Sequence, residues 1–295
     1  MSFRFMCAYC LPFGARIAFT VCYALMTLFG GFGNFISIIC IRKKNQVPNE
    51  RDKIDQILLS LAVCDTLVSF TVYPLHGWLN YWEKIPFHHI HTKVFYTWTL
   101  AMTSVSSVTI IMLAAIKYFK LSRFSKFDDI ITENRLRMMI VLSWLIPILF
   151  MCPYIITQSY PLIVCSFIIT CSTLVSLPIF YFLILYLYKK SRQRVASLTS
   201  SRQQITSLGM TTSTYSRKLI LRSLWLIGAY FLCTVLTIPC MVLLVLHTKD
   251  IFFYQLTNLV FLGNSCVNPC IYMYKDKKIR KIAKGLLRKC IKITR

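Results

Sequence analysis

Long apolar runs separated by short polar segments are the dominant pattern along this chain. A membrane-crossing helix needs about 20 mostly apolar residues, and seven runs reach that length. We expect the first to remain as a helix, because no small-residue cleavage site follows it. The pattern predicts an all-α membrane protein, a seven-transmembrane helix bundle over residues 17–274 between outer residues 1–16 and a tail at 275–295. The predicted spans are 17–41, 57–81, 94–118, 138–160, 166–188, 219–247 and 251–274.

The composition supports a membrane environment. Hydrophobic residues make up 56% of the 295 residues and charged residues only 15%, whereas soluble domains average about 45–50% and about 25%. These values exclude an ordinary soluble enzyme and a disordered chain. The segments between the apolar runs are also too short for a soluble catalytic domain, so we expect no enzyme.

Positive charge is distributed unevenly between the two sides of the predicted bundle. Of the 34 Lys and Arg residues, 29 fall after the first, third and fifth spans or in the tail. Basic residues concentrate on the cytoplasmic side of membrane proteins. We therefore expect a multi-pass protein of the cell membrane with an extracellular N-terminus and a cytoplasmic C-terminus. The net charge of +24 then faces the anionic inner leaflet rather than nucleic acid. The other five basic residues are Arg4, Arg16, Lys84, Lys93 and Lys249.

Polar residues inside the apolar runs are the first candidates for chemistry. Asp65 lies about 12 Å into its helix, at about 1.5 Å per residue, and a charge at the membrane centre costs about 2.5–3.5 kcal/mol. It is either a structural, hydrogen-bonded carboxylate or part of a cation or proton site. Five other polar side chains can reach a common centre with it, namely Asn34, Ser106, Asn264, Ser265 and Asn268.

Three prolines interrupt predicted helices. Pro178, Pro239 and Pro269 lie in the fifth, sixth and seventh spans, and each removes one backbone hydrogen bond and clashes with the carbonyl four residues earlier. Membrane helices tolerate such kinks, and a kink can also act as a hinge. Both interpretations remain open for all three.

Several motifs, each in the matching helix, resemble those of rhodopsin-like (class A) G-protein-coupled receptors, and the resemblance covers essentially the whole chain. Leu61-Ala62-Val63-Cys64-Asp65 is similar to the family's LAxxD motif, and residues 264–272 are similar to its NSxxNPxxY motif. Four further matches are Gly33-Asn34, Trp144, Pro178 and Tyr186.

The resemblance implies a receptor that binds an extracellular ligand and signals to heterotrimeric G proteins, and to arrestin, through a rearrangement of helix 6. It implies no cofactor other than an allosteric Na+ in a pocket formed by Asn34, Asp65, Ser106, Asn264, Ser265 and Asn268. The implied G-protein interface and switch residues are Ile116, Lys117, Tyr118, Tyr186 and Tyr272. The implied ligand cavity contains Trp98, Thr99, Thr103, Thr237, Cys240, Tyr254 and Leu262.

The chain departs from the family at several of these positions. Ile116-Lys117-Tyr118 stands where the family has Asp-Arg-Tyr, and Thr237 replaces the helix 6 tryptophan. Leu262 replaces the lysine with which opsins bind retinal, and Thr99 replaces the acid of amine receptors. Because the acids that restrain the family's arginine are absent, we expect basal activity that is either high or absent.

The outer end of the bundle is aromatic, and the sequence shows no buried acid or base there. This pattern suggests an uncharged small molecule, or a peptide held by loops, as the ligand. Cys165 is predicted in the second outer loop. The family's usual partner is a cysteine at the top of helix 3, and that position falls near Thr92 here, so Cys7 or Cys10 are alternative disulfide partners.

The tail is predicted to form a basic amphipathic helix on the inner leaflet. Cys290 lies on its apolar side and is a candidate for palmitoylation. The family has a short eighth helix in the same place.

Two other functions remain as alternatives. One is an ion or solute transporter or channel with Asp65 in the translocation path, although such a path usually has more ionisable groups than this chain offers. The other is a receptor-like protein that does not signal.

Overall fold

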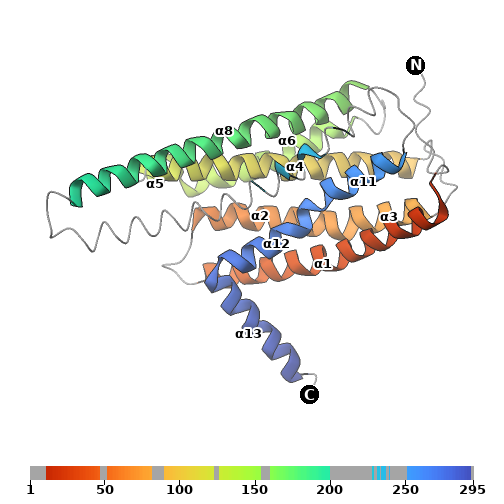
Figure 1. The fold of residues 1–295 in the computed structure, drawn as a ribbon, viewed down its shortest axis with the longest axis horizontal. Coiled ribbons are helices and arrows are strands. Elements are labelled where there is room, and N and C mark those ends of the chain that lie inside the picture. Colours follow the sequence, from red (N-terminus) through yellow and green to blue (C-terminus); the bar gives the residue numbers. More distant parts are fainter. Residues whose placement is uncertain are drawn as a thin grey trace.

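The structure is a computed structural model. It describes residues 11–46, 52–81, 90–122, 126–153, 160–199 and 251–293, together with residues 228, 231–232, 234–236 and 239. All regular secondary structure in these ranges is helical. Most helices run side by side in an elongated bundle, and α13 leaves it at an angle near one end (Figure 1).

Helices of very different length follow one another along the described part of the chain. In chain order, they are α1 (Phe13–Asn45), α2 (Lys53–Leu67), the π-helical turn η3 (Val68–Val72), α3 (Tyr73–Tyr81), α4 (Ile90–Ser122), α5 (Phe127–Ile130), α6 (Glu133–Met151), α8 (Tyr160–Thr199), α11 (Ile251–Leu262), α12 (Asn264–Lys275) and α13 (Lys277–Ile293).

Four stretches of helix in the described ranges are long and apolar enough to cross a membrane. They cover Phe13–Asn45, Lys53–Tyr81, Lys93–Ser122 and Glu133–Met151. A shorter apolar stretch, Ser172–Leu187, belongs to α8. These match the first five predicted spans, and α11 with α12 matches the seventh. Most of the predicted sixth span, 219–247, lies outside the described residues.

The ends of helices differ from the predicted ends where local chemistry decides them. Helix α6 begins at Glu133 because the Thr132 side chain accepts a hydrogen bond from the Arg135 amide, which is a standard N-cap. It ends at Met151 rather than 160, and Pro153, which lacks an amide hydrogen, follows shortly after.

Helix α8 begins earlier than predicted, so one prediction is wrong. Cys165 lies inside α8, not in an outer loop, because the helix already starts at Tyr160. Pro161 is the second residue of this helix, and a proline in the first turn removes no internal hydrogen bond. The side chain of Cys165 is not among the described side chains, and its candidate partners Cys7 and Cys10 lie outside the described residues.

Two predicted single helices are interrupted. In the second span, η3 comes directly before Tyr73-Pro74. A proline clashes with the carbonyl four residues earlier, and a wider π turn relieves such a clash. In the seventh span, Gly263 separates α11 from α12, and the Cys266 amide donates to its carbonyl over 3.0 Å.

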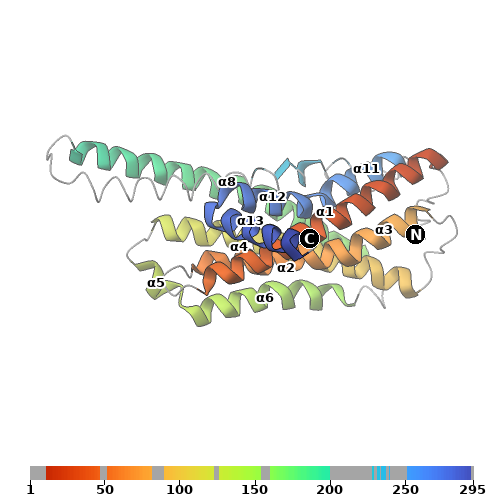
Figure 2. The same ribbon diagram turned by 90° about the horizontal axis from the view of Figure 1, so that it is seen from below.

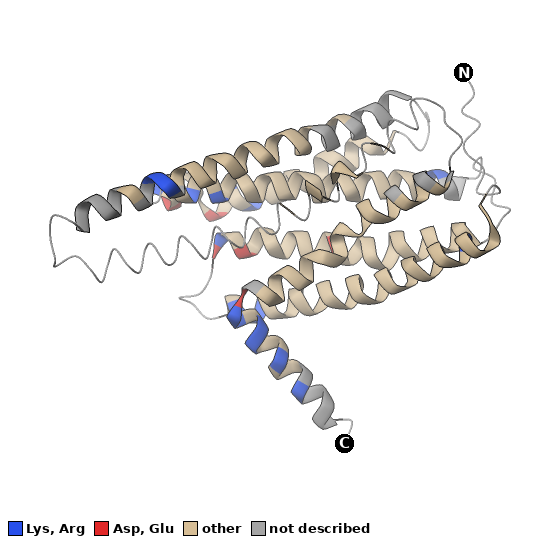
Figure 3. Cartoon of the chain, in the orientation of Figure 1, with Lys and Arg blue, Asp and Glu red and all other residues tan. Residues whose placement is uncertain are grey.

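Helix α4 is central and packs against α2, α6 and α8, with α8 and α6 on opposite sides of it (Figure 2). Near its charged end, an apolar inner cluster joins α4 to α2, α5, α6 and α12. It consists of Ile54, Ile57, Met112, Leu113, Ile116, Phe127, Ile131, Leu136, Ile271 and Tyr272. The described charged residues gather mostly at this end of the bundle (Figure 3).

Candidate functional site

Asp65 is the centre of a buried polar group between helices 2 and 7. Its side chain is completely buried, with 0% of the residue exposed. The Ser265 hydroxyl donates to Asp65 Oδ1 and the Asn268 amide donates to Oδ2, each over 2.7 Å. Both hydrogen bonds connect α2 to α12. The structure therefore brings together three of the residues that the sequence grouped.

Asn34 connects helix 1 to the same group and compensates for a proline. Pro269 removes the hydrogen bond that the Ser265 carbonyl would otherwise accept within the helix. Asn34 Nδ2 donates to that carbonyl over 2.8 Å, and also to the Gly30 carbonyl over 2.9 Å. A buried carbonyl without a partner is costly, so Asn34 and Pro269 form a matched pair across two helices.

Ser106 and Asn264 are also buried, but neither hydrogen bonds to Asp65 in the described part of the chain. Three buried oxygens have no hydrogen-bond partner among the described residues, namely Ser106 Oγ, Asn264 Oδ1 and Asn34 Oδ1. Helix α4 approaches α2 here, since Cys64 Sγ donates to the Met102 carbonyl, one turn before Ser106. Hard cations prefer oxygen ligands. The residues therefore fit a sodium ion in their chemistry.

At the inner end of α4, Ile116 is packed where the family has an acid. It is 1% exposed and belongs to the inner cluster together with Tyr272. Lys117 is 5% exposed. The Tyr118 ring lies 6.2 Å from the Phe180 ring of α8, measured between centroids. Apolar packing therefore joins this end of α4 to α12.

Tyr186 is not brought into this group. It is 60% exposed on α8, and Lys190 Nζ lies 5.8 Å from the centre of its ring. Tyr272 is buried, and its hydroxyl has no hydrogen-bond partner in the part of the chain that the structure describes. The two tyrosines that the sequence assigned to one switch thus have different surroundings.

An ion-pair cluster that the sequence pattern did not predict ties the tail helix to the bundle. Lys44 Nζ lies 2.6 Å from Asp55 Oδ2 and 3.4 Å from Asp276 Oδ2. Asp276 Oδ1 accepts from the Lys278 amide over 2.9 Å and so caps α13. The signal in the sequence was an acid directly before the basic tail. α13 itself, over Lys277–Ile293, confirms the predicted amphipathic helix; the Cys290 side chain is not among the described side chains.

The predicted ligand-cavity residues are only partly described. Trp98 Nε1 donates to Thr71 Oγ1 over 2.8 Å. The Thr99 hydroxyl is buried and has no hydrogen-bond partner within the described ranges. The Thr103 hydroxyl donates to the Thr99 carbonyl. Leu262 packs in the hydrophobic core, and its carbonyl accepts from the Tyr73 hydroxyl. Thr237, Cys240 and the Tyr254 side chain lie outside the described residues.

The expectation that no base is buried at the outer end is wrong. His76 is 5% exposed, stacks on Tyr23 at 5.4 Å and meets Phe95 edge-on at 4.8 Å. Arg16 is also buried and donates to the Tyr81 carbonyl over 3.3 Å. Both residues were overlooked because the predicted helix 1 started after Arg16 and the run around His76 was treated as uniformly apolar.

The three candidate hinge prolines are in described positions. Pro269 is buried in α12, Pro178 is half-buried in α8, and Pro239 is helical and exposed. Of these, only Pro269 has a described side chain, Asn34, that replaces its lost hydrogen bond.

Apolar helices of membrane-spanning length, joined by a buried polar centre and with charges gathered at one end, define a helical membrane protein. The family "7 transmembrane receptor (rhodopsin family)" matches residues 33–272, so the chain belongs to this family. It is therefore a class A G-protein-coupled receptor and a multi-pass membrane protein.

Comparison with solved structures supports the fold. The crystal structure of squid rhodopsin is similar, with a TM-score of 0.79 and 16% sequence identity, over 95% of this chain and 87% of that chain. At this identity the likeness shows the fold alone. No curated protein sequence matches the chain significantly.

Proposed function

We propose that this receptor has an extracellular N-terminus and a cytoplasmic tail, and that ligand binding outside rearranges helix 6 around Pro239 to engage a G protein inside. The distribution of basic residues supports this orientation. The described charges gather mostly at the end that carries α13 (Figure 3), which is where an anionic inner leaflet would attract them.

The observation that carries the proposal is the position of α12 between two groups of contacts. Ser265 and Asn268 attach it to Asp65 in the middle of the bundle. Further along the same helix, Tyr272 packs with Ile116 in the inner cluster. A movement of α12 therefore changes the polar centre and the inner face together, as a receptor needs for relaying a signal across the membrane.

We propose that the polar centre holds Na+. Asp65 would supply the charge, and the hydroxyl oxygens of Ser106 and Ser265 would be further ligands. Asn34, Asn264 and Asn268 would complete the pocket. When bound, the ion neutralises a carboxylate that has no Lys or Arg ion-pair partner among the described residues. An ion that prefers one conformation shifts the population toward it.

The proposed ligand is an uncharged small molecule or a peptide. Thr99 stands where amine receptors have an acid, and Leu262 stands where opsins have the retinal lysine. The buried His76 and Arg16 weaken the argument from a neutral outer end, so the proposal depends on these two substitutions alone. Arrestin is proposed as a second intracellular partner.

A receptor-like protein that does not signal is the second candidate. The observation that favours it is Ile116-Lys117-Tyr118 at the inner end of α4. Lysine lacks the flat, forked donor set of arginine, and this weakens the recognition of a G protein. The transporter alternative loses its support because the family is a receptor family.

A second-messenger assay in cells tests the proposal. We expect expression of the chain to change basal levels of a second messenger, or a tissue extract to evoke a response that mock-transfected cells lack. Surface expression is measured in parallel with an N-terminal tag. A chain that reaches the surface and gives neither response with any G-protein reporter would support the non-signalling candidate instead.

A further inference from the structure

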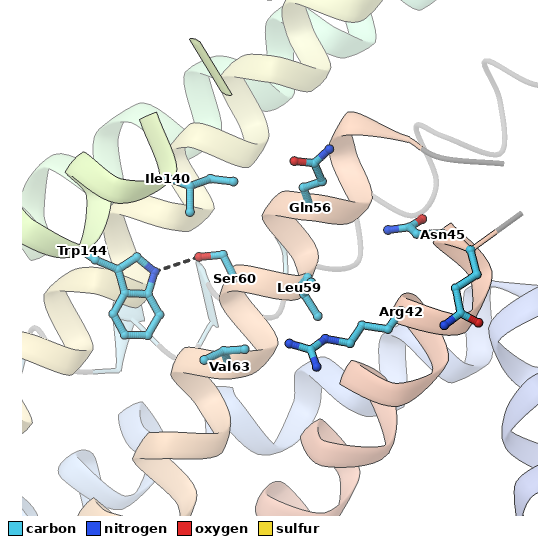
Figure 4. A pocket seen from close by; sticks show the side chains of 9 residues that line it. Arg42, Asn45, Gln56, Leu59, Ser60, Val63, Ile140 and Trp144 are labelled. Carbon is cyan, nitrogen blue, oxygen red and sulfur yellow. Dashed lines mark hydrogen bonds between the residues drawn. The ribbon is translucent and has the colours of Figure 1, made fainter. Parts of the chain in front are cut away.

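A groove opens between α1, α2 and α6, apart from the polar centre. Its volume is about 670 Å3. Figure 4 shows side chains from all three helices turned toward this space. The groove is lined by Arg42, Asn45, Gln46, Gln56, Leu59, Ser60, Val63, Ile140 and Trp144.

The lining changes from polar to apolar along the groove. Arg42, Asn45 and Gln46 come from the last turn and cap of α1, and Gln56 comes from the first turn of α2. Further into the bundle, the wall consists of Leu59, Val63, Ile140 and Trp144. The Trp144 indole is held in place because its Nε1 donates to Ser60 Oγ over 2.8 Å. A charged head beside an apolar wall is the chemistry of a phospholipid.

Arg42 is the cation at the head of the groove. Its neighbour Lys44 forms ion pairs with Asp55 and Asp276. Gln56 Nε2 donates a hydrogen bond to Glu133 Oε2 over 2.8 Å. No acid pairs with Arg42 in the described part of the chain. Figure 4 shows its side chain extending from α1 toward Leu59 and Val63. Its donors are therefore available to an anion in the groove.

Asn45 provides a second, independent indication. Its Oδ1 is buried without a hydrogen-bond partner among the described residues, which is costly for a polar atom. A ligand with a hydroxyl or ammonium donor next to its phosphate would satisfy this acceptor. Serine, glycerol and inositol headgroups carry such donors, whereas the trimethylammonium of phosphatidylcholine has no N–H to donate.

We propose that this groove is a binding site for an anionic phospholipid of the cytoplasmic leaflet. The phosphate binds the Arg42 guanidinium, which offers two parallel donors to such a group. A headgroup donor reaches Asn45, and one acyl chain lies along Leu59, Val63, Ile140 and Trp144. Basic pockets between helices on the cytoplasmic side are suited to acidic headgroups. The site uses the orientation proposed above and is independent of G-protein coupling.

The test is native mass spectrometry of the full chain with phosphatidylserine, phosphatidylinositol, phosphatidylcholine or cholesterol. Arg42→Gln removes the phosphate contact. Lys43→Gln is the matched control, because it removes an equal charge at the next position, outside the groove. Val63→Phe fills the apolar part and leaves the charge unchanged. Tag accessibility on intact and permeabilised cells that express the same chain reports the orientation separately.

We expect the parent to retain an anionic lipid in preference to phosphatidylcholine. Arg42→Gln should weaken its binding about tenfold, the effect of losing one charge-assisted contact, and Val63→Phe should also weaken it. Lys43→Gln should leave it within about twofold. If Arg42→Gln and Lys43→Gln weaken lipid binding equally, the lipid is held by nonspecific charge attraction, and the proposed site is overturned. Binding of cholesterol that does not depend on Arg42 would overturn it as well.

Discussion

Asp65 has both carboxylate oxygens hydrogen-bonded by donors from helix 7 and no ion-pair partner in the described residues. A carboxylate in this state keeps its charge only if something else compensates for it. Three buried oxygens in the surrounding pocket residues also have unused capacity to accept a contact. A bound sodium ion would account for both observations.

Replacing Asp65 by Asn should abolish the sodium dependence of thermal stability. At a sodium concentration about ten times Kd, binding stabilises the folded state by about 1.4 kcal/mol, which corresponds to about 3–6 °C in a chain of this size. Melting is measured in NaCl and in choline chloride. Asp55→Asn, which removes an acid near the inner end of the same helix, is the control and should keep the sodium-dependent shift in melting temperature.

The sodium pocket would be contradicted by a parent protein that melts at the same temperature in both salts. An Asp65→Asn variant with an undiminished shift would contradict it equally, because the ion would then bind elsewhere.

A substitution at Ile116 tests whether apolar packing keeps the inner face closed in the resting state. Ile116→Val removes one methyl group from the inner cluster, and this change typically costs about 0.5–1.5 kcal/mol. If the cluster is specific to the resting state, basal nucleotide exchange should rise about two- to tenfold. Ile110→Val, on the same helix in a separate apolar cluster, should leave exchange unchanged. The same rise in both variants would show a general loss of packing.

The sequence predicted part of this site for a simple physical reason. Polar side chains in apolar runs avoid lipid, so Asp65, Ser265 and Asn268 were expected to meet, and they do. The exposure of Tyr186 and the burial of Arg16 and His76 depend on helix rotation and on where helix 1 begins. Apolar runs report neither of these.

Helix 1 approaches its neighbours closely because of its glycines. A Cβ added at Gly30 would lie 2.7 Å from Ser69 Oγ and 2.8 Å from Cys266 Sγ, and one at Gly33 would lie 3.0 Å from two Pro269 side-chain atoms. Helices 2 and 7 therefore both pack against a helix surface without side chains. This contact places Asn34 close enough to reach the Ser265 carbonyl.

Gly30→Ala should lower the melting temperature of the purified receptor. Two neighbouring groups must shift to admit the methyl group, and overpacking of this kind costs about 1–3 kcal/mol. Gly14→Ala is the control, because no described residue lies within 4 Å of a Cβ there, and alanine is the better helix former. Gly30→Ala melting at or above the temperature of Gly14→Ala would contradict the close approach.

At the scale of the element, the existence of the spans was predictable and their interruptions were not. Apolar length alone identifies a membrane helix, and each of the first five predicted spans overlaps a described helix or a continuous run of helices. The π turn before Pro74 and the break at Gly263 depend on how neighbouring helices satisfy displaced backbone groups. Hydropathy carries no information about that.

The proposed orientation of the whole molecule is based on its charge. An epitope tag before Met1 should be stained on intact cells, and a tag after Arg295 should be stained only after permeabilisation. The physical reason is that translocation of basic segments is disfavoured, and 29 of the 34 basic residues lie on the proposed cytoplasmic side. Reversed staining of the two tags would place the basic surface outside and contradict the proposed path of the signal.

Coupling to a G protein through the inner face is tested most directly by nucleotide exchange on purified heterotrimeric G proteins, with the receptor in nanodiscs. We expect nucleotide exchange to be faster with the parent receptor than with empty nanodiscs for at least one G-protein class. Lys117→Ala should reduce that exchange, because the inner end of α4 then loses its buried cation. If the parent, Lys117→Ala and Lys117→Arg all give the same nucleotide exchange as empty nanodiscs with every class, the chain does not couple to G proteins.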